Sequence, residues 1–468
     1  MSLILKYSLF LLLLLSSLEA NQFFLVSKEN YVTSKSPKIT DLKEVKGDYI
    51  IASPFAKGDE LTWIKKFNIV ELGNVEDKNV NATLLKKQGL LQIPHHIAYD
   101  WMPALYYYTD GENRDFVKWL YKHREKTTLN PEGPFIHCKE NHYDWCREYY
   151  YNLGNKELFD KRVADLLNNM QEKKFNGIFF DWAPAQYILD KPYKEILSNF
   201  KKLNPKLQYF DLVEKFYKTL KKKNIFVVTN QGFRQKQFVL PYVSYDMTES
   251  YITTDVIKKI KLQLLNKGWV DEISVTNYYP IYDNSQSIAD SLKFIDMLTK
   301  YKKEYKKDGF KNFIYLNYIA PDYEKVYKNL PLYKEVKPKN AIYFSYAMAK
   351  LTNNLVYAEI PTNRKLERDE IYFYDLGAPL GESYEKIGTL EGYIRFYEKG
   401  FVLVCEQSSE ELYLKIQSPH LKRGRTILDT YSNIYLKSQK ETTVVDLKFQ
   451  KDIFTHKNLP LGRVYLYL

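Results

Sequence analysis

The stretch Phe175–Pro184 (FNGIFFDWAP) constrains the fold of this chain more than any other. Gly177 is followed by Ile178–Phe180, a short and fully apolar run that is typical of a strand buried on both faces, as in a parallel sheet. Asp181 follows at once, and barrels and doubly wound sheets carry their active sites at the carboxyl ends of such strands. The alternative is an Asp that only caps the next turn.

Strand-like runs of this kind recur along the chain with helical patterns between several of them. The runs are 48–53, 69–73, 95–102, 178–181, 225–230, 243–249, 273–278 and 313–319. The clearest helical pattern begins at Asn155, a suitable N-cap, and the last expected helix is 341–351. Eight strands that alternate with helices predict an α/β fold, a (β/α)8 TIM-type barrel.

The rest of the chain differs from the barrel in its patterning. After residue 366 the helical periodicity fades and short β-rich runs separated by turn residues predict a small C-terminal antiparallel β-sandwich, 366–468. We expect the barrel to span 47–365 with a long aromatic insertion at 127–153, and residues 21–46 to be a loose polar lead-in.

The first 20 residues have the layout of a secretory signal peptide. Lys6 precedes the apolar run 7–15, and the segment 16–20 that follows ends in the small residue Ala20, the expected cleavage position. The apolar run is short for a transmembrane span, although an uncleaved anchor is the alternative, and no later segment is long and apolar enough to span a bilayer. The prediction is a secreted or periplasmic protein without a membrane span after cleavage.

The cysteines and the charge say less about function. In an oxidising compartment Cys138 and Cys146 are close enough in sequence to form a bridge, whereas Cys405 lies in a strand-like run and is expected to be a buried free thiol. The formal charge is +12, but the basic residues are spread along the chain and no nucleic-acid motif is present, so we expect no nucleic-acid partner.

Polar and aromatic residues gather at the predicted carboxyl ends of the strands, which share one rim in a barrel. Glycoside cleavage needs one carboxyl group to protonate the leaving oxygen and a second to act as nucleophile or base. The predicted catalytic residues are Asp181 and Glu249. The predicted substrate-binding residues are Tyr99, Asp100, Trp101, Trp182, Asn230, Gln231, Asp246, Asn277, Tyr278 and Asn317.

No cofactor or metal is expected. His95 and His96 are adjacent, so they point to opposite faces of a strand and cannot both bind one metal inside the barrel. Asp181 is predicted to be the nucleophile or base and Glu249 the general acid, with the reverse assignment also open. Glu249 as a capping residue or an ion-pair partner is the alternative without catalysis.

Three motifs in this order carry a resemblance to a known group of proteins. GIFFDW at 177–182, IFVVTNQGF at 225–233 and YDMTESY at 245–251 resemble the barrel proteins of glycoside hydrolase family 114, related to the endo-α-1,4-polygalactosaminidases, and the hypothetical glycosyl hydrolase family 15 group. The family pattern of a strand-end Asp, an Asn-rich end and a strand-end Glu falls on Asp181, Asn230 and Glu249.

The tail carries part of the same resemblance. DLGAPLG at 375–381, YIRF at 393–396 and GFVLV at 400–404 resemble the β-domain that closes many such barrels, but the Asn-Pro that often follows in the family is Cys405-Glu406 here. The resemblance implies an enzyme that acts on an amino-sugar or related extracellular polysaccharide. An inactive polysaccharide-binding barrel and a surface scaffold protein are the alternatives, and neither the sugar nor the oligomeric state follows from the sequence.

Overall fold

The computed structural model describes most of the chain, and its contacts divide the chain into two compact units. The described residues are 21–35, 42–75, 77–100, 105–107, 115–131, 148–181, 194–230, 239–249, 288–316, 338–358, 370–388, 390–407, 409–421, 426–439, 441–451 and 458–468. One unit contains Gly47–Tyr251 and Met297–Leu316, and the other contains Met1–Lys46, Ile252–Asp296 and Asn317–Leu468.

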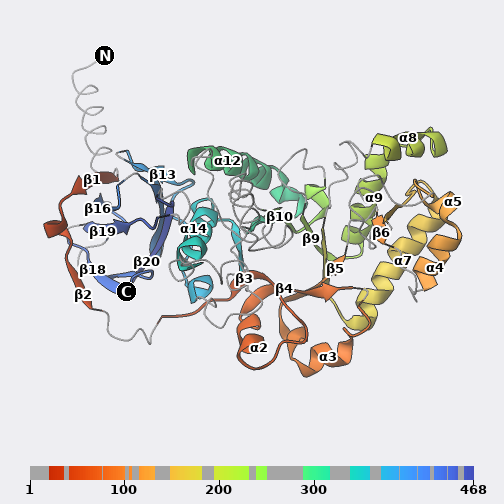
Figure 1. Cartoon of the computed structure of the whole chain (residues 1–468), viewed down its shortest axis with the longest axis horizontal. Coiled ribbons are helices and arrows are strands. Elements are labelled where there is room, and N and C mark those ends of the chain that lie inside the picture. The colour runs from red at the N-terminus through yellow and green to blue at the C-terminus, as the bar shows by residue number, and fades with distance from the viewer. Residues whose placement is uncertain are drawn as a thin grey trace, which may run out of the picture. The chain divides into compact units, whose positions relative to one another are not determined.

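A closed eight-stranded barrel confirms the predicted fold class (Figure 1). Its strands in spatial order are β3 (Gly47–Ile51), β4 (Phe67–Asn74), β5 (His95–Asp100), β8 (Gly177–Phe180), β9 (Phe226–Asn230), β10 (Tyr245–Glu249), β11 (Asn312–Leu316) and β12 (Leu355–Ala358). The pairings from β3 to β5, from β5 to β8, and from β8 through β9 and β10 to β11 are parallel. Parallel strands bring their carboxyl ends to one rim, where the candidate residues were expected.

The last two barrel strands differ from the expected series. The run 273–278 lies outside the described residues, and β10 pairs directly with β11, which corresponds to the run 313–319. The eighth position is taken by β12, the run LVYA, which lies inside the expected barrel span 47–365 but was not predicted to be a strand. Four residues directly after a long apolar helix give too short an alternation to stand out as a strand.

Helices α7 (Lys156–Lys173) and α9 (Tyr209–Lys222) lie against the outer side of the barrel wall. Asn155 caps α7 as predicted, because its side chain accepts a hydrogen bond of 3.1 Å from the backbone N–H of Leu158. Phe180 of β8 meets two rings of α9 edge to face, Phe216 at 5.8 Å and Tyr217 at 5.7 Å between centroids. Even-numbered residues of β8 therefore face the helices, and odd-numbered ones face the barrel interior.

Further elements surround these strands and helices. They are α2 (Gly58–Ile64), α3 (Ala82–Lys87), η2 (Leu90–Gln92), β6 (Leu105–Tyr107), α4 (Asp115–Lys122), α5 (Arg124–Thr127), β7 (Glu148–Tyr150), α8 (Lys194–Leu203), η4 (Leu240–Tyr242), α12 (Ile288–Tyr305) and η5 (Lys306–Asp308). β6 and β7 form a small antiparallel ribbon, and β7 lies in the predicted insertion. Cys138 and Cys146 lie outside the described residues. Over the ranges given above, no helix combines the length and apolar character that a membrane crossing requires.

Stacked rings close the amino-terminal end of the barrel. His95 stacks on Phe226 with 3.7 Å between ring centroids, and the ammonium of Lys311 lies over both Phe226 and Tyr245. His96, by contrast, contacts backbone carbonyls outside the barrel, those of residues 93 and 174. The opposite orientations of the two histidines confirm the expected alternation. Because the rings fill the amino-terminal end of the barrel, a site is expected at the carboxyl ends of the strands.

Two antiparallel sheets form the C-terminal part of the chain. The larger contains β13 (Glu385–Lys386), β14 (Glu391–Tyr397), β15 (Gly400–Glu406), β20 (Leu461–Tyr467), β17 (Thr426–Asp429), β18 (Ile434–Lys437) and β2 (Thr33–Lys35), in that order. The smaller contains β1 (Gln22–Val26), β16 (Glu411–Gln417) and β19 (Thr442–Lys448). One apolar core, which includes buried Cys405, draws side chains from both sheets, as in a sandwich.

The segment before the barrel differs from the loose lead-in that its composition suggests. β1 pairs with β16, and β2 pairs with β18, so residues from the start of the described chain complete both C-terminal sheets. β2 is entirely polar and the apolar run of β1, Phe23–Val26, is short, so neither strand stood out from the polar residues around it. Both strands lie at sheet edges, where one side of the strand meets solvent.

Helix α14 (Pro338–Leu351) packs on β15 and β20 of the larger sheet (Figure 1). This is the helix expected at 341–351. Gly462 in β20 allows its close approach, because a Cβ there would lie 2.4 Å from the Cα of Phe344 and from the carbonyl oxygen of Tyr343. The guanidinium of Arg395 is buried and donates 2.7 Å to the carbonyl of Leu351, one of the carbonyls at the end of the helix.

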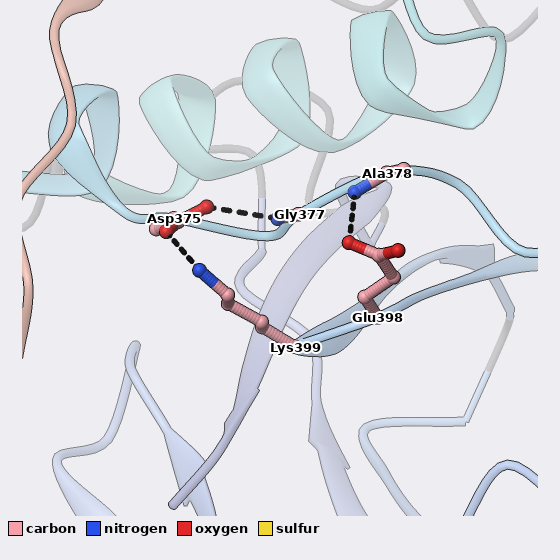
Figure 2. Close-up of polar contacts among 5 residues, drawn as sticks. All are labelled: Asp375, Gly377, Ala378, Glu398 and Lys399. Carbon is pink, nitrogen blue, oxygen red and sulfur yellow. Dashed lines mark hydrogen bonds and ion pairs between the residues drawn. The ribbon is translucent and has the colours of Figure 1, made fainter.

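The DLGAPLG segment is a turn fastened to the hairpin between β14 and β15 (Figure 2). Asp375 accepts a hydrogen bond of 3.0 Å from the N–H of Gly377 and pairs with Lys399, while Glu398 accepts one of 3.0 Å from the N–H of Ala378. Gly377 has φ +72°, a conformation that favours glycine. These contacts give the segment a structural role within the C-terminal sheets.

Candidate active site

Asp181 lies at the carboxyl end of β8, partly buried and held by both neighbouring strands. The hydroxyl of Tyr99 on β5 donates to Oδ2 over 3.1 Å, and Nδ2 of Asn230 on β9 donates to Oδ1 over 2.9 Å. The Asp181 N–H donates 3.0 Å to the carbonyl of Asp100. Both carboxyl oxygens accept hydrogen bonds, which favours the ionised form. Three of the predicted site residues are thus brought together.

Asp100 is turned away from this group. Asp100 is the last residue of β5, the strand next to β8. Its side chain faces the helices because the preceding residue, Tyr99, faces the interior. Its Oδ2 lies 2.6 Å from the guanidinium of Arg162 on α7, and both side chains are almost fully buried. Burial opposes the charge of Arg162, but the nearby Asp100 carboxylate raises the pKa of the guanidinium above its ordinary value. Asp100 therefore joins a barrel strand to a helix and is not part of the group around Asp181.

Asp246 has the same orientation on β10. It is 1% exposed, and its Oδ1 accepts a hydrogen bond of 2.7 Å from the hydroxyl of Thr229, its register partner on β9. Because Asn230 is the next residue on β9 and faces Asp181, Thr229 and Asp246 belong to the outer layer of the barrel wall. The structure places Asp246 in the packing between strands and helices, not at the rim.

Glu71 is a site residue that the sequence reasoning did not select. It lies within β4 in an apolar run, IVELG, is 3% exposed, and its Oε2 accepts a hydrogen bond of 2.6 Å from the hydroxyl of Tyr49 on β3. Burial raises the pKa of the Glu71 carboxyl to about 8; the Tyr49 hydrogen bond opposes this, and the negative charge of Asp181 adds to it. A carboxylate inside an otherwise apolar strand was the signal that could have identified it.

Aromatic rings connect these two carboxyl groups along the inner face of the barrel. Tyr49 packs against Phe179 with 6.4 Å between centroids, and Phe179 packs against Tyr99 with 5.9 Å. Tyr99 in turn donates to Asp181. Four adjacent strands, β3, β4, β5 and β8, thus contribute to one packed layer beneath the rim.

Glu249 is the last residue of β10, where its Cα partner is Leu316 of β11. Its side chain lies outside the part of the chain that the structure describes. The other predicted substrate-binding residues lie outside the described residues: Trp101, Trp182, Gln231, Asn277, Tyr278 and Asn317.

The described part of the site is suited to acid–base or nucleophilic chemistry at a carboxylate. It contains one carboxylate at the rim, positioned by two neutral donors, and beneath it one buried carboxyl group whose pKa is raised by burial. Within the ranges that the structure describes, no group of His, Cys, Asp and Glu residues could hold a metal ion.

Comparisons with known proteins add structural likenesses at low identity. The sequence matches no protein-family profile, and no curated protein matches it either. Among solved structures, an α-amylase from Anoxybacillus aligns with a TM-score of 0.45 and 11% identity over 90% of this chain and 98% of the amylase. The α-amylase GTA from Geobacillus thermoleovorans, solved with acarbose, aligns with a TM-score of 0.44 and 11% identity over 90% and 98%.

A third structure is the GH36 α-galactosidase AgaA from Geobacillus stearothermophilus, which aligns with a TM-score of 0.42 and 8% identity over 94% of this chain and 57% of the galactosidase. Such likenesses do not carry a substrate or a mechanism to this chain. The candidate site therefore rests on its own geometry.

Proposed function

We propose that this protein is a glycoside hydrolase that cleaves an extracellular polysaccharide, with Asp181 as one catalytic carboxylate. The observation that carries the proposal is the position of Asp181 at the barrel rim, with Tyr99 and Asn230 donating to its two oxygens. A nucleophile or base must be ionised and fixed in direction, and these two donors supply both conditions. The tyrosine and amide of the same group are also side chains that hydrogen-bond sugar hydroxyls.

Glu249 is the proposed partner, as general acid, from the end of β10. In the barrel order β10 lies two strands from β8, and alternate strands contribute to the same layer of a barrel. A carboxyl separation near 5 Å would indicate a retaining enzyme, and one of about 6.5–9.5 Å an inverting enzyme. The resemblance to the endo-α-1,4-polygalactosaminidases favours an amino-sugar polymer as the first substrate to test.

The test is release of reducing ends from partially acetylated α-1,4-galactosaminan and from a panel of neutral and acidic polysaccharides. Asp181→Asn and Glu249→Gln should each lower turnover by orders of magnitude. Asp160→Asn is the matched control, because Asp160 is exposed on α7 and pairs only with the exposed Lys156 in the described contacts. Polysaccharide binding without any reducing ends would instead favour an inactive binding barrel, and full activity in either variant would contradict the assignment.

Export is part of the same proposal and has its own test. Cleavage after Ala20 would leave a mature chain that begins at Asn21, immediately before β1. N-terminal sequencing of protein recovered outside the cytoplasm should therefore begin at or near Asn21. Recovery of exported protein with Met1 intact would contradict a cleaved signal peptide.

A further inference from the structure

Glu71 is buried in the same inner layer as Asp181 and is too enclosed to reach a substrate. Only 3% of the residue is exposed, so its carboxyl group is not available to protonate a leaving oxygen at the rim. A buried carboxyl group without a cation beside it is costly when ionised. The titratable groups described around it are Tyr49 on β3 and Asp181 after β8, and neither supplies a positive charge. A role for Glu71 must therefore act through its neighbours.

A series of contacts connects Glu71 to Asp181. Glu71 accepts the hydroxyl of Tyr49 at 2.6 Å, which fixes the Tyr49 ring against Phe179. Phe179 packs on Tyr99, and the Tyr99 hydroxyl donates to Asp181. Loss of the acceptor on Glu71 would leave a buried hydroxyl without this partner at the start of this series of contacts. Each member is confined by the next, so a displacement at Glu71 reaches the carboxylate at the rim.

We infer that Glu71 is a positioning residue for Asp181 that works as an uncharged carboxylic acid. This inference rests on the proposed role of Asp181. As an uncharged acid, Glu71 holds Tyr49 without placing a second negative charge beside Asp181. When Glu71 ionises, its buried negative charge and the charge of Asp181 repel each other, because little water surrounds Glu71 to screen them. Asp181 is then driven from the position that Tyr99 and Asn230 give it.

Substituting glutamine or leucine at position 71 separates two properties of Glu71, its hydrogen-bond acceptor and its ability to ionise. Glu71→Gln keeps the oxygen that accepts from Tyr49 and never ionises, so it reproduces the uncharged acid. Glu71→Leu keeps the apolar stem but has no acceptor. Glu172→Gln is the matched control, because Glu172 is an exposed glutamate on α7.

The first experiment detects the proton directly, without any substrate. Infrared difference spectra of the full chain at neutral pH should show the carbonyl band of a buried protonated carboxyl group that Glu71→Gln removes and Glu172→Gln does not. The midpoint at which this band disappears should fall in Asp181→Asn, because the nearby negative charge is gone. Absence of the band in the unaltered chain, or an unchanged midpoint in Asp181→Asn, would overturn the inference.

The second experiment follows kcat/KM for galactosaminan against pH. The unaltered chain should lose activity as pH rises through about 8, whereas Glu71→Gln should keep its neutral-pH activity and lose this decline. Glu71→Leu should lower activity at every pH. A Glu71→Gln variant as inactive at neutral pH as Asp181→Asn would refute positioning by an uncharged acid. If galactosaminan and the polysaccharide panel are not cleaved, the proposed function fails, and the infrared experiment still decides the state of Glu71.

Discussion

Replacing Glu71 by glutamine should change how the stability of the barrel depends on pH. The Glu71 carboxyl has a pKa of about 8 in the folded chain and an ordinary value of 4.5. Between these two values the folded state keeps a proton that the unfolded state has released. Raising the pH through this window therefore removes stability from the unaltered chain, and the loss is complete once pH exceeds the folded pKa.

The size of the effect follows from the same two values. Each pKa unit corresponds to about 1.4 kcal/mol, so the free energy of unfolding should fall by about 5 kcal/mol between pH 4.5 and pH 8 because of this one group. An amide does not titrate, so Glu71→Gln should not show this fall. The difference in free energy of unfolding between the variant and the unaltered chain should increase steadily with pH, in favour of the variant.

Urea unfolding followed by fluorescence, at a series of pH values from below 4.5 to above 8, measures this difference. Subtracting the free energy of unfolding of one chain from that of the other removes the contribution of groups that titrate alike in both. Glu172→Gln, at an exposed position, should follow the unaltered chain throughout. A constant difference between Glu71→Gln and the unaltered chain across this window would refute the reasoning, because it would mean that Glu71 ionises as freely in the folded state as in the unfolded one.

Substitutions at three further positions test the packing described above by urea unfolding. Arg162→Met should destabilise the barrel by about 3–5 kcal/mol because it leaves Asp100 buried and without its cation, and a loss below about 1 kcal/mol would contradict a buried ion pair. Gly462→Ala should cost about 1–3 kcal/mol or more, since its Cβ would meet the backbone of Phe344 at 2.4 Å, and an unchanged stability would contradict that close approach. Asn155→Ala should cost about 1 kcal/mol through loss of the α7 cap, whereas Asn155→Asp, which keeps the acceptor, should cost less.

The barrel and the central carboxylate could be predicted because both depend on local sequence. A buried parallel strand reads as a continuous apolar run, so Ile178–Phe180 and the Asp181 that follows identified β8 and its end directly. The eighth strand could not be found in this way. Its four residues form a strand because they pair with neighbouring strands in the closed sheet, and the short run by itself carries no clear strand pattern.

The site was predicted only in part because position along a strand does not by itself give the side-chain direction. Asp100 ends β5, but it directly follows Tyr99, which faces the interior, so its side chain faces the helices. Asp246 was expected at a carboxyl end but is the second residue of β10, and its side chain also faces outward. Applying the alternation from Tyr99 would have placed Asp100 correctly. Glu71 was missed because its importance comes from Tyr49 and Asp181, which reach it from strands that are distant in sequence.

The pairing of β1 with β16 and of β2 with β18 has a consequence for how the chain is made. β1 and β2 are synthesised first, and their partners β16 and β18 follow only after the whole barrel sequence has been translated. At about 5–20 residues per second this delay is on the order of tens of seconds. During that time Phe24 and Leu25, apolar residues of β1, have no sheet to join. The larger sheet cannot close until β20, which lies between β15 and β17, has left the ribosome. The larger sheet therefore stays incomplete until β20 is synthesised, and a chain that stops before β20 would keep both of its early strands open to aggregation.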